Sequence, residues 1–589
     1  MPRERLFRTL LALAAVVVAR PATADFTDFG SSLLGVNLNS RSASLADIDN
    51  DDDLDLLFQG STGAQKLYRN ELETGSLGFT LQSDWTNLGV TAGSWSTAWG
   101  DINGDGFVDA FVGQSNIGQV GDVLVNDGTG GFINESFSRN LADPGFHQNV
   151  AWADMNNDNR LDLVIAMEGP DPFVDERHEI YLQDASGSFT AAGAAAGFQQ
   201  DFGTKAYGMA IGDADGDGDL DVYISTCRRG GNIRNNFYEN QYAQTGVMSF
   251  IDIADDNGTQ YLDNSYGAEF HDFDDDGDLD LFVVGADSED SKIYRNDGGN
   301  QFTDVDTITG RSLLSDVSGD LNGGKAIDYD NDGDLDLFFH DHDARNNRNN
   351  ARKLYRNNGD WSFTDVTFFE GLAEVNRGSY DSPWGDLDRD GDQDLIGTTD
   401  SGTLERIFLS DESENGNTWL YVELTGDSGN STAIGAAVYA TIHQGTPEER
   451  TLRREANTNA GTFNQSDVPV HFGLGDATIV DELRIVWPNG VTNVYTDVAV
   501  DQYAAFAIAN IEGDFNGDGA VNNDDLNLLL NNWGETDVAP EWVNGLSGAV
   551  DNEELNRLLN SWGVGTGAPV PEPATLLLSL CGLAALRRR

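Results

Sequence analysis

Cysteine is almost absent from this chain of 589 residues, which contains only Cys227 and Cys581. This scarcity excludes an intramolecular disulfide framework, so a loop-rich exported protein needs another cross-link, such as metal. Positive charge is also scarce, with 34 Lys and Arg against 99 Asp and Glu and a net charge of −65. A surface of that sign repels nucleic acid and anionic lipid, so we expect neither as a partner. The catalytic patterns G-x-S-x-G and H-E-x-x-H and the P-loop are missing as well.

Aromatic residues (10%) and 67 glycines are, by contrast, abundant. Disordered acidic chains are poor in aromatics, whereas here aromatic and turn residues alternate along the sequence. We therefore expect a folded chain, which at 589 residues should contain several domains.

Residues 1–24 have the organisation of a secretory signal peptide. An arginine-containing start precedes an apolar run from Leu10 to Ala19, and Ala22–Ala24 is an A-x-A cleavage site. The apolar run is too short to span a bilayer. We therefore expect cleavage before Asp25 and a protein that is secreted or displayed on the cell surface of a bacterium.

Seven acidic loops of nine residues recur, with starts 54, 53, 59, 59, 56 and 58 residues apart. Positions 1, 3, 5 and 9 are always Asp or Asn, whereas position 7 is Asp, Phe or Arg. Position 6 is Gly in five loops and Asp52 or Asn159 in the others, residues that tolerate left-handed backbone. Positions 1, 3, 5, 7 and 9 are Asp47, Asp49, Asp51, Asp53 and Asp55 in loop 1; Asp101, Asn103, Asp105, Phe107 and Asp109 in loop 2; Asp154, Asn156, Asp158, Arg160 and Asp162 in loop 3; Asp213, Asp215, Asp217, Asp219 and Asp221 in loop 4; Asp272, Asp274, Asp276, Asp278 and Asp280 in loop 5; Asp328, Asp330, Asp332, Asp334 and Asp336 in loop 6; and Asp386, Asp388, Asp390, Asp392 and Asp394 in loop 7.

These loops predict calcium sites, because alternate side chains on a tight turn converge and clustered hard oxygens suit Ca²⁺. Phe and Arg side chains cannot bind a cation, so position 7 should coordinate through its backbone carbonyl. Simple turns held by Asx hydrogen bonds are the alternative, but one ligand pattern repeated seven times favours about seven Ca²⁺ ions. Mg²⁺ fits less well because it prefers to keep its waters.

Strands are expected around every loop. An apolar run follows each loop, a second short strand of the KLYRN type comes next, and in six repeats a third run begins at Phe. The seventh repeat lacks this third run, which Phe26–Phe29 can supply, closing a ring and removing both sheet edges. We therefore predict a mainly β protein with a seven-bladed β-propeller over residues 25–415, with an open solenoid as the alternative.

The GDxDxDGDxD loops, LYRN strands and FTDVT strands resemble the FG-GAP/VCBS repeats of integrin-alpha-type propellers, from Asp25 to Glu414. Integrin alpha chains as a family carry such loops in only some blades, whereas every repeat has one here. The resemblance implies a calcium-dependent extracellular propeller.

Residues 416–511 alternate apolar strands with Gly turns, which predicts a small β-sandwich or barrel-like domain. The stretches SGNSTAIGAAV, HFGLG and VWPNG resemble the ASPIC/UnbV domain of the cartilage acidic protein family and its bacterial relatives. The sequence departs from that family at Ala460–Ser466, where the family has a Gly-Gly-Tyr-like turn before Gln-Ser.

Residues 512–565 resemble a type I dockerin repeat pair, which implies a small α-helical, EF-hand-like module and a cohesin-like partner. The second copy lacks acidic ligands at loop positions 1, 3 and 5, so we expect one Ca²⁺ in the first copy, and a structural role is an equal alternative. The candidate ligands of the first copy are Asp514, Asn516, Asp518, Ala520, Asn522 and Asp525.

Residues 566–589 contain Pro-Glu-Pro, an apolar run over Ala574–Leu586 and Arg587–Arg589. This order resembles the PEP-CTERM sorting signal of bacteria that make exopolysaccharide, which implies only transient membrane contact before removal. A weak membrane anchor is the alternative, although the run is short for a span.

The leading interpretation is a non-catalytic, calcium-binding surface or matrix protein whose propeller binds an extracellular polysaccharide or a surface protein. One alternative is a polysaccharide-active lyase or hydrolase, for which His340 and His342 are the best local candidates. Another is an assembly module that uses the dockerin-like pair. Fold alone does not decide between them, because propellers host many functions.

Overall fold

The fold is known from a computed structural model. It describes residues 26–29, 40–60, 65–72, 77–84, 90, 93–115, 119–142, 144–167, 178–199, 205–227, 234–286, 290–309, 321–341, 352–373, 381–398, 405–411, 415–427, 429–458, 461–462, 465–466, 468–508, 523–533, 550, 555 and 558. The predictions for the signal peptide, the sorting tail and most of the dockerin-like module lie outside these residues.

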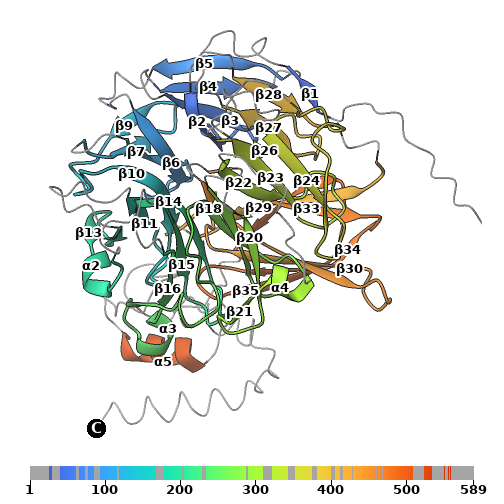
Figure 1. Cartoon of the computed structure of the whole chain (residues 1–589). Coiled ribbons are helices and arrows are strands. Elements are labelled where there is room, and N and C mark those ends of the chain that lie inside the picture. Colours follow the sequence, from blue (N-terminus) through green and yellow to red (C-terminus); the bar gives the residue numbers. More distant parts are fainter. Residues whose placement is uncertain are drawn as a thin grey trace, which may run out of the picture.

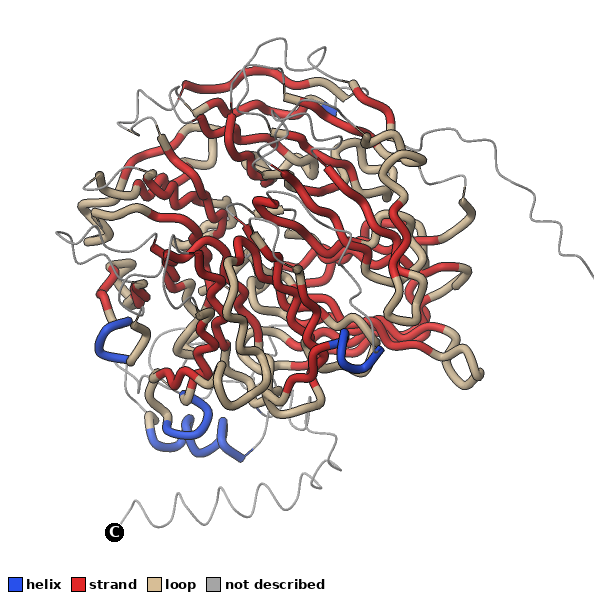
Figure 2. The backbone as a smooth tube through the Cα atoms, viewed as in Figure 1, coloured by secondary structure: helices blue, strands red, loops and turns tan. Residues whose placement is uncertain are grey.

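The described chain is mainly β, with short helices at its edges (Figure 2). Seven antiparallel sheets, numbered here in chain order, each have four strands, and sheet 4 gains a fifth. The first six are β2 (Ser40–Ala46), β3 (Asp55–Gly60), β4 (Lys66–Asn70), β5 (Phe79–Asp84); β6 (Ser94–Gly100), β7 (Asp109–Gln114), β8 (Asp122–Asn126), β9 (Phe132–Asn134); β10 (His147–Ala153), β11 (Asp162–Met167), β12 (Glu179–Gln183), β13 (Phe189–Ala191); β14 (Lys205–Gly212), β15 (Asp221–Cys227), β16 (Asn236–Asn240), β17 (Phe250–Asp252); β18 (Ser265–His271), β19 (Asp280–Gly285), β20 (Lys292–Asn296), β21 (Phe302–Asp304); and β22 (Leu321–Ile327), β23 (Asp336–Asp341), β24 (Arg352–Asn357), β25 (Phe363–Asp365). Sheet 7 contains β26 (Trp384–Gly385), β27 (Asp394–Gly397) and β28 (Arg406–Leu409), and is completed by β1 (Thr27–Asp28).

The two strands expected after each loop are confirmed, and so is the third run in six repeats, which begins at the expected phenylalanine each time. The sequence does not predict the strand that precedes each loop. Strands such as β2, SRSASLA, are rich in small polar residues and lack the apolar pattern of the others. They are buried because the first strands of neighbouring sheets lie side by side around the centre of the molecule (Figure 1).

The N-terminal strand completes the last sheet. Thr27 pairs with Leu409 and Asp28 with Phe408, as the sequence predicts. Apolar cores lie between every pair of successive sheets, and one further core joins sheet 1 to sheet 7 through Leu56, Phe58 and Ile407. Figure 1 accordingly places the blue β2–β5 beside β27 and β28. These contacts make the repeat region propeller-like.

In several sheets, a side-chain amide at the end of the third strand donates a hydrogen bond to the preceding sheet. Asn126 Nδ2 donates to Ile48 O at 2.7 Å, and Asn70 Nδ2 donates to Leu387 O at 2.9 Å, which links sheet 1 back to sheet 7. The equivalent donors in sheets 3, 4 and 5 are Gln183, Asn240 and Asn296. The recurring Asn of the LYRN strands is therefore a connector, a role that its repetition in sequence could have indicated.

Replacing Asn126 with Ala should destabilise the protein by about 1–2 kcal/mol, because a buried carbonyl loses its donor. Asn358→Ala is the matched control, since Asn358 bonds only within an exposed turn. Urea unfolding midpoints measure both. Equal midpoints for the two variants would contradict the connector role.

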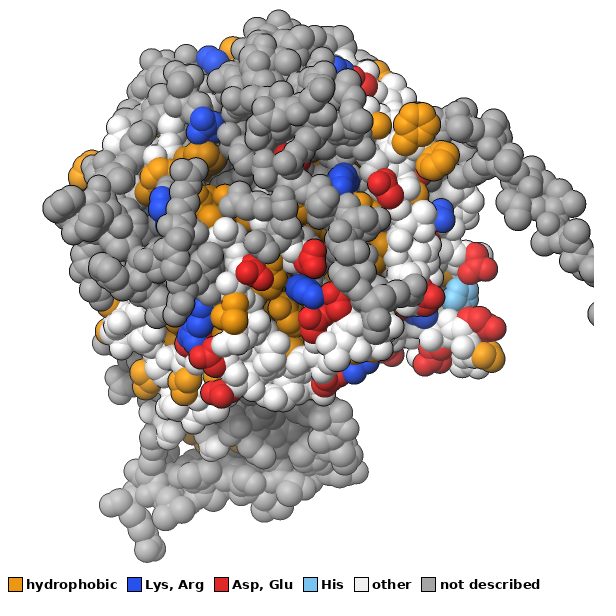
Figure 3. All heavy atoms as spheres, in the orientation of Figure 1, with side chains coloured by type: hydrophobic (Ala, Val, Ile, Leu, Met, Phe, Trp, Pro, Cys, Tyr) orange, Lys and Arg blue, Asp and Glu red, His pale blue; other side chains and the backbone are white. Residues whose placement is uncertain are grey.

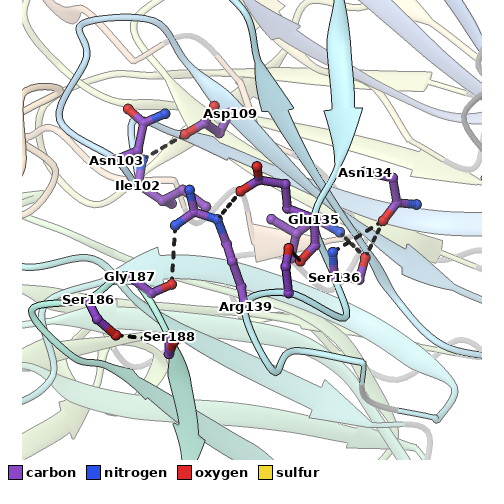
Figure 4. Close-up of polar contacts among 12 residues, drawn as sticks. Ile102, Asn103, Asp109, Asn134, Glu135, Ser136, Arg139, Ser186, Gly187 and Ser188 are labelled. Atoms are coloured by element: carbon purple, nitrogen blue, oxygen red, sulfur yellow. Dashed lines mark hydrogen bonds and ion pairs between the residues drawn. The ribbon is translucent and has the colours of Figure 1, made fainter.

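At the outer edge, Arg139 joins sheets 2 and 3. Its Nη1 donates to Gly187 O at 3.2 Å, while its Nε pairs with Glu135 at 2.8 Å (Figure 4). The short helices α2 (Gly193–Ala196), α3 (Tyr242–Thr245) and α4 (Val305–Thr309) also lie at sheet edges. None of the described helices is long and apolar enough to cross a membrane.

The C-terminal β domain, residues 415–508, has two sheets around one apolar core that includes Leu420, Val438 and Phe472. Strands β29 and β36 are parallel, and the other pairs are antiparallel. Its strands are β29 (Thr418–Thr425), β30 (Ala437–Ile442), β31 (Arg450–Glu455), β33 (Val470–Gly475), β34 (Val480–Val486), β35 (Thr492–Val498) and β36 (Gln502–Ala507).

This domain sends a segment among the first strands of the sheets. Strand β32 (Gly461–Thr462) is the fifth strand of sheet 4, where it pairs with β14. Thr458 Oγ1 and the Trp152 backbone exchange two 2.9 Å hydrogen bonds in sheet 3. Gln465 Oε1 accepts from Trp99 N at 2.7 Å in sheet 2, and Ser466 Oγ from Trp384 N at 3.3 Å in sheet 7. Thr458 and the described residues of the segment that departs from the family pattern thus contact the inner strands of four sheets.

Helix α5 (Asn523–Asn531) follows the dockerin-like loop, as the leucine spacing predicts, and Leu529 packs with Val550 and Leu558. Asp525 is buried in this helix. The other five candidate ligands, residues 514–522, lie outside the described part of the chain.

Candidate metal centres

Each acidic loop connects the first and second strands of its sheet and turns twice through left-handed backbone. Position 6 has a positive φ in all seven loops, including 68° at Asp52 and 62° at Asn159, as predicted. Position 4 also has a positive φ, which the residue types do not predict, and Arg389 at 58° is the bulkiest example. In loops 4, 5 and 6 the carboxylates at positions 1, 3 and 5 converge.

The aspartate at position 1 closes the turn. Asp328 is representative: its Oδ1 accepts from Asp332 N at 3.1 Å and its Oδ2 from Gly333 N at 2.9 Å. Loops 1, 2, 3, 4 and 7 repeat both bonds, and loop 5 keeps the one from Gly277 N. The loop shape is therefore fixed largely by hydrogen bonds to a ligand candidate.

The aspartate at position 9 ties the loop to its hairpin in every repeat. In loop 2, Ile102 N donates to Asp109 Oδ2 at 3.1 Å (Figure 4), and Asn126 N donates to Oδ1 at 2.8 Å. The same two backbone donors recur in the other six loops. Position 9 is thus both a candidate cation ligand and a structural tie. The sequence does not predict the structural role, because the loop pattern carries no information about hydrogen bonds to the next strand.

Side chains at position 7 point away from the loop centre in four loops. Asp53 accepts from Leu72 N at 3.1 Å, Asp219 from Ala243 N at 2.7 Å, and Asp392 from Asn331 Nδ2 at 2.9 Å. Asp334 pairs with Arg450 at 2.6 Å. The group left for a cation at this position is the backbone carbonyl.

Three carboxylates in each of five loops have oxygens within 4.8 Å of one another. They are Asp47, Asp49 and Asp55 in loop 1; Asp213, Asp215 and Asp217 in loop 4; Asp272, Asp274 and Asp276 in loop 5; Asp328, Asp330 and Asp332 in loop 6; and Asp386, Asp388 and Asp394 in loop 7. Among the described residues, loops 2 and 3 have no such trio, and both have Asn at position 3. The loops are therefore not equivalent.

Burial makes these carboxylates hard to ionise together. It raises the pKa of Asp55 to about 9, that of Asp390 to about 8 and that of Asp272 to about 7, with neighbouring aspartates adding to each effect. Asp272 is 1% exposed, and its Oδ1 accepts no hydrogen bond from any described residue. A buried oxygen of that kind, beside two other carboxylates, fits a hard cation with oxygen ligands.

Arginine side chains reduce the net negative charge of loops 1 and 3. In loop 1, Arg69 of β4 contacts Asp49 and Asp51, each at 2.7 Å. In loop 3, Arg160 at position 7 pairs with Asp158 of the same loop and donates to Gln183 O at 3.1 Å. These loops have smaller net negative charge than loop 4, where Glu239 occupies the place of Arg69 and adds to the repulsion on Asp215.

The one described candidate residue of the enzymatic alternative does not lie at the surface. His340 is fully buried in β23 and pairs in register with Arg352 of β24. His342 lies outside the described residues.

Comparison with known families finds two of the four sequence resemblances, and the dockerin-like and PEP-CTERM-like resemblances stay predictions. FG-GAP-like repeats match residues 47–112, 272–339 and 328–397, and an ASPIC and UnbV domain matches residues 426–512. The chain thus contains FG-GAP-like repeats and an ASPIC/UnbV domain.

Two solved structures are similar to much of the chain. An Agrocybe aegerita lectin, described for its recognition of non-reducing terminal N-acetylglucosamine, aligns at 17% identity and a TM-score of 0.37, covering 63% of this chain and 90% of the lectin. BBS1N, solved in complex with ARL6DN, aligns at 12% identity and a TM-score of 0.39, covering 66% and 97%. No protein with a curated description matches the sequence.

Proposed function

We propose that this chain is a calcium-binding extracellular protein in which Ca²⁺ in the acidic loops stabilises a seven-bladed propeller that binds a carbohydrate or protein partner. The observation that carries the calcium assignment is the trio of close carboxylates in five loops, with Asp272 Oδ1 buried. In each loop, positions 1, 3, 5 and 9 would supply side-chain oxygens and position 7 a backbone carbonyl. Bound Ca²⁺ would supply the positive charge that lets these carboxylates stay ionised in the folded state.

The blade count follows from the sheets and their cores. Seven sheets and seven inter-sheet cores, one of them joining sheets 1 and 7, favour a closed ring over an open solenoid. The Asn70 to Leu387 hydrogen bond crosses the same seam. Metal and fold would be thermodynamically linked, because the four acidic positions of the seven loops contain 26 carboxylates (28 positions less Asn103 and Asn156).

Removing Ca²⁺ with EDTA at pH 7.5 should lower the thermal midpoint by about 10 °C or more, since each site at 100 times its Kd contributes about 2.7 kcal/mol. Differential scanning calorimetry measures the shift. Added Ca²⁺ should restore the midpoint and added Na⁺ should not. An EDTA-treated protein with an unchanged midpoint would rule the proposal out.

A non-catalytic role is proposed over the polysaccharide-active alternative because His340 is fully buried. The partner would bind away from the acidic loops, since the C-terminal β domain contacts them. Exposed phenylalanines at sheet edges, Phe137 at 81% and Phe368 at 78%, support such a contact. A glycan and protein array, with and without Ca²⁺, would identify the partner class, and release of reducing sugars or unsaturated products would instead show an enzyme.

A further inference from the structure

Side chains at position 4 join neighbouring acidic loops. Asn50 Nδ2 of loop 1 donates to Gly106 O of loop 2 at 2.9 Å, and Asn157 Nδ2 of loop 3 donates to Gly218 O of loop 4 at 2.9 Å. Loops 6 and 7 are joined through Asn331, whose Nδ2 lies 2.9 Å from Asp392 Oδ1. Arg389 of loop 7 in turn donates to the Asp52 carbonyl of loop 1. Four of the seven junctions between successive loops therefore have a direct contact.

Position 4 cannot make this contact at the other three junctions. It is glycine in loops 2 and 4, at Gly104 and Gly216, so no side chain is present. In loop 5 it is Asp275, whose carboxylate can only accept. At all three junctions the C-terminal β domain makes the contacts instead.

Between loops 2 and 3 the contacts come from the turn after β29. Ser431 Oγ donates to Asp101 at position 1 of loop 2, and Asp427 Oδ1 accepts from Asn159 Nδ2 of loop 3 at 2.5 Å. Gly429 packs so closely on Asn159 that a Cβ there would lie 2.1 Å from its carbonyl oxygen. This turn therefore spans both loops.

Between loops 4 and 5 the contact is Arg453, which is 6% exposed. Its Nη1 donates to Gly277 O of loop 5 at 2.7 Å, and Arg453 lines the same pocket as Asp213 and Gly218 of loop 4.

Between loops 5 and 6 the contact is Arg450, which bridges Asp275 at 2.7 Å and Asp334 at 2.6 Å. Arg454 adds a bond from its Nη2 to Gly333 O at 3.2 Å. The three arginines bind side chains at positions 4 and 7 and carbonyls at positions 5 and 6, and they make no hydrogen bond to a described side chain at position 1, 3 or 5.

We propose that the C-terminal β domain completes a ring of contacts among the seven acidic loops and positions them for cooperative cation binding. This inference rests on the proposed calcium-binding function. Most of the loop groups that contact the domain lie outside the candidate ligand set, whereas Ser431 and Tyr503 each donate to a position 1 aspartate. The domain therefore holds the turn from which the ligands project, so docking of the domain and binding of Ca²⁺ stabilise the same loop conformation. Two events that favour one conformation strengthen each other reciprocally.

The charge of the docked arginines alone predicts the opposite effect on Ca²⁺ affinity, which makes the proposal testable. Arg450 lies beside loops 5 and 6 and repels a cation, so on Coulomb grounds its removal should tighten Ca²⁺ binding. If Arg450 positions the loops, its removal should weaken Ca²⁺ binding and reduce cooperativity.

The experiment compares the full chain with Arg450→Met and with Arg234→Met by calcium titration calorimetry. Arg234 is a matched control, because it also bridges two carboxylates, Asp252 and Asp255, but outside the acidic loops. We expect Arg450→Met to raise the Ca²⁺ midpoint of the affected sites about fivefold or more and to flatten the titration, with the control unchanged. Unchanged or tighter binding in Arg450→Met would overturn the inference while leaving calcium binding intact. A wild-type chain that binds no Ca²⁺ would instead overturn the proposed function, and the inference with it.

A second variant adds a contact instead of removing one. A Cβ at Gly216 meets no atom within 4 Å, its φ of 75° suits Asn, and Gly216→Asn would place an amide donor toward loop 5 as in loops 1 and 3. Gly246→Asn, at a φ of 70° and equally open, is the control outside the loops. We expect Gly216→Asn to lower the Ca²⁺ midpoint about twofold relative to the control. A midpoint equal to that of Gly246→Asn would count against the ring.

Discussion

At pH 8 the gap in thermal midpoint between calcium-bound and metal-free protein should be about twice as large as at pH 5, or more. Burial raises the pKa of Asp55 to about 9, that of Asp390 to about 8 and that of Asp109 to about 7, against 3.8 in the unfolded chain. The metal-free folded state therefore holds protons that the unfolded state releases. Its stability is greatest below about pH 4 for these groups and falls as pH rises through 7 to 9.

Bound calcium removes this dependence, because the ligands are then ionised in the folded state as they are in the unfolded chain above about pH 5. Calcium affinity should rise over the same pH interval, while the stability of the bound protein stays nearly constant. Scanning calorimetry from pH 5 to pH 8 tests this, with metal removed by chelating resin because EDTA itself titrates. Calcium binding at pH 6 should also release protons into a weak buffer. Parallel pH profiles with and without Ca²⁺, or binding without proton release, would show that these carboxylates are not the ligands.

Replacing Phe26 with Ala should destabilise the protein by about 3 kcal/mol, the cost of removing a buried phenylalanine. Phe26 is 4% exposed and packs edge-on against Trp384, with ring centroids 5.8 Å apart, in the core between sheets 6 and 7. It directly precedes β1, so its loss should weaken the strand that completes sheet 7. The shift in the urea midpoint measures the effect.

Phe29→Ala is the matched control, because Phe29 ends the same segment but is 40% exposed. It should change the free energy of unfolding by less than about 1 kcal/mol. If both variants unfold alike, the N-terminal segment does not stabilise the ring through its core contact.

The sequence predicted the repeats well because they share one recurring pattern: Asp or Asn at alternate loop positions, an apolar strand and, in six of them, a phenylalanine that starts the third run. The left-handed backbone at Asp52 and Asn159 followed from the residue types alone. The pairing of Thr27 with Leu409 followed from counting strands, since only the last repeat lacked one.

Contacts between repeats could not be predicted in the same way. The first strand of each sheet is buried by its neighbours, so its small polar residues carry no apolar period to detect. The roles of Arg450 and Arg453 depend on where a separate domain docks, and nothing in their local sequence specifies that. Asn50 and Asn331 look like ordinary turn residues until the next loop is in place.

The pairing of β1 with β28 has a consequence for how the chain folds. Each hairpin and its acidic loop can form locally and early, but the last sheet cannot be completed until strands from the two ends of the repeat region meet. Such a contact has the highest loop-closure cost in the molecule, so it should form late and slowly. Until then β28 presents an open edge, and an arrested or truncated chain would be most prone to aggregate at that strand.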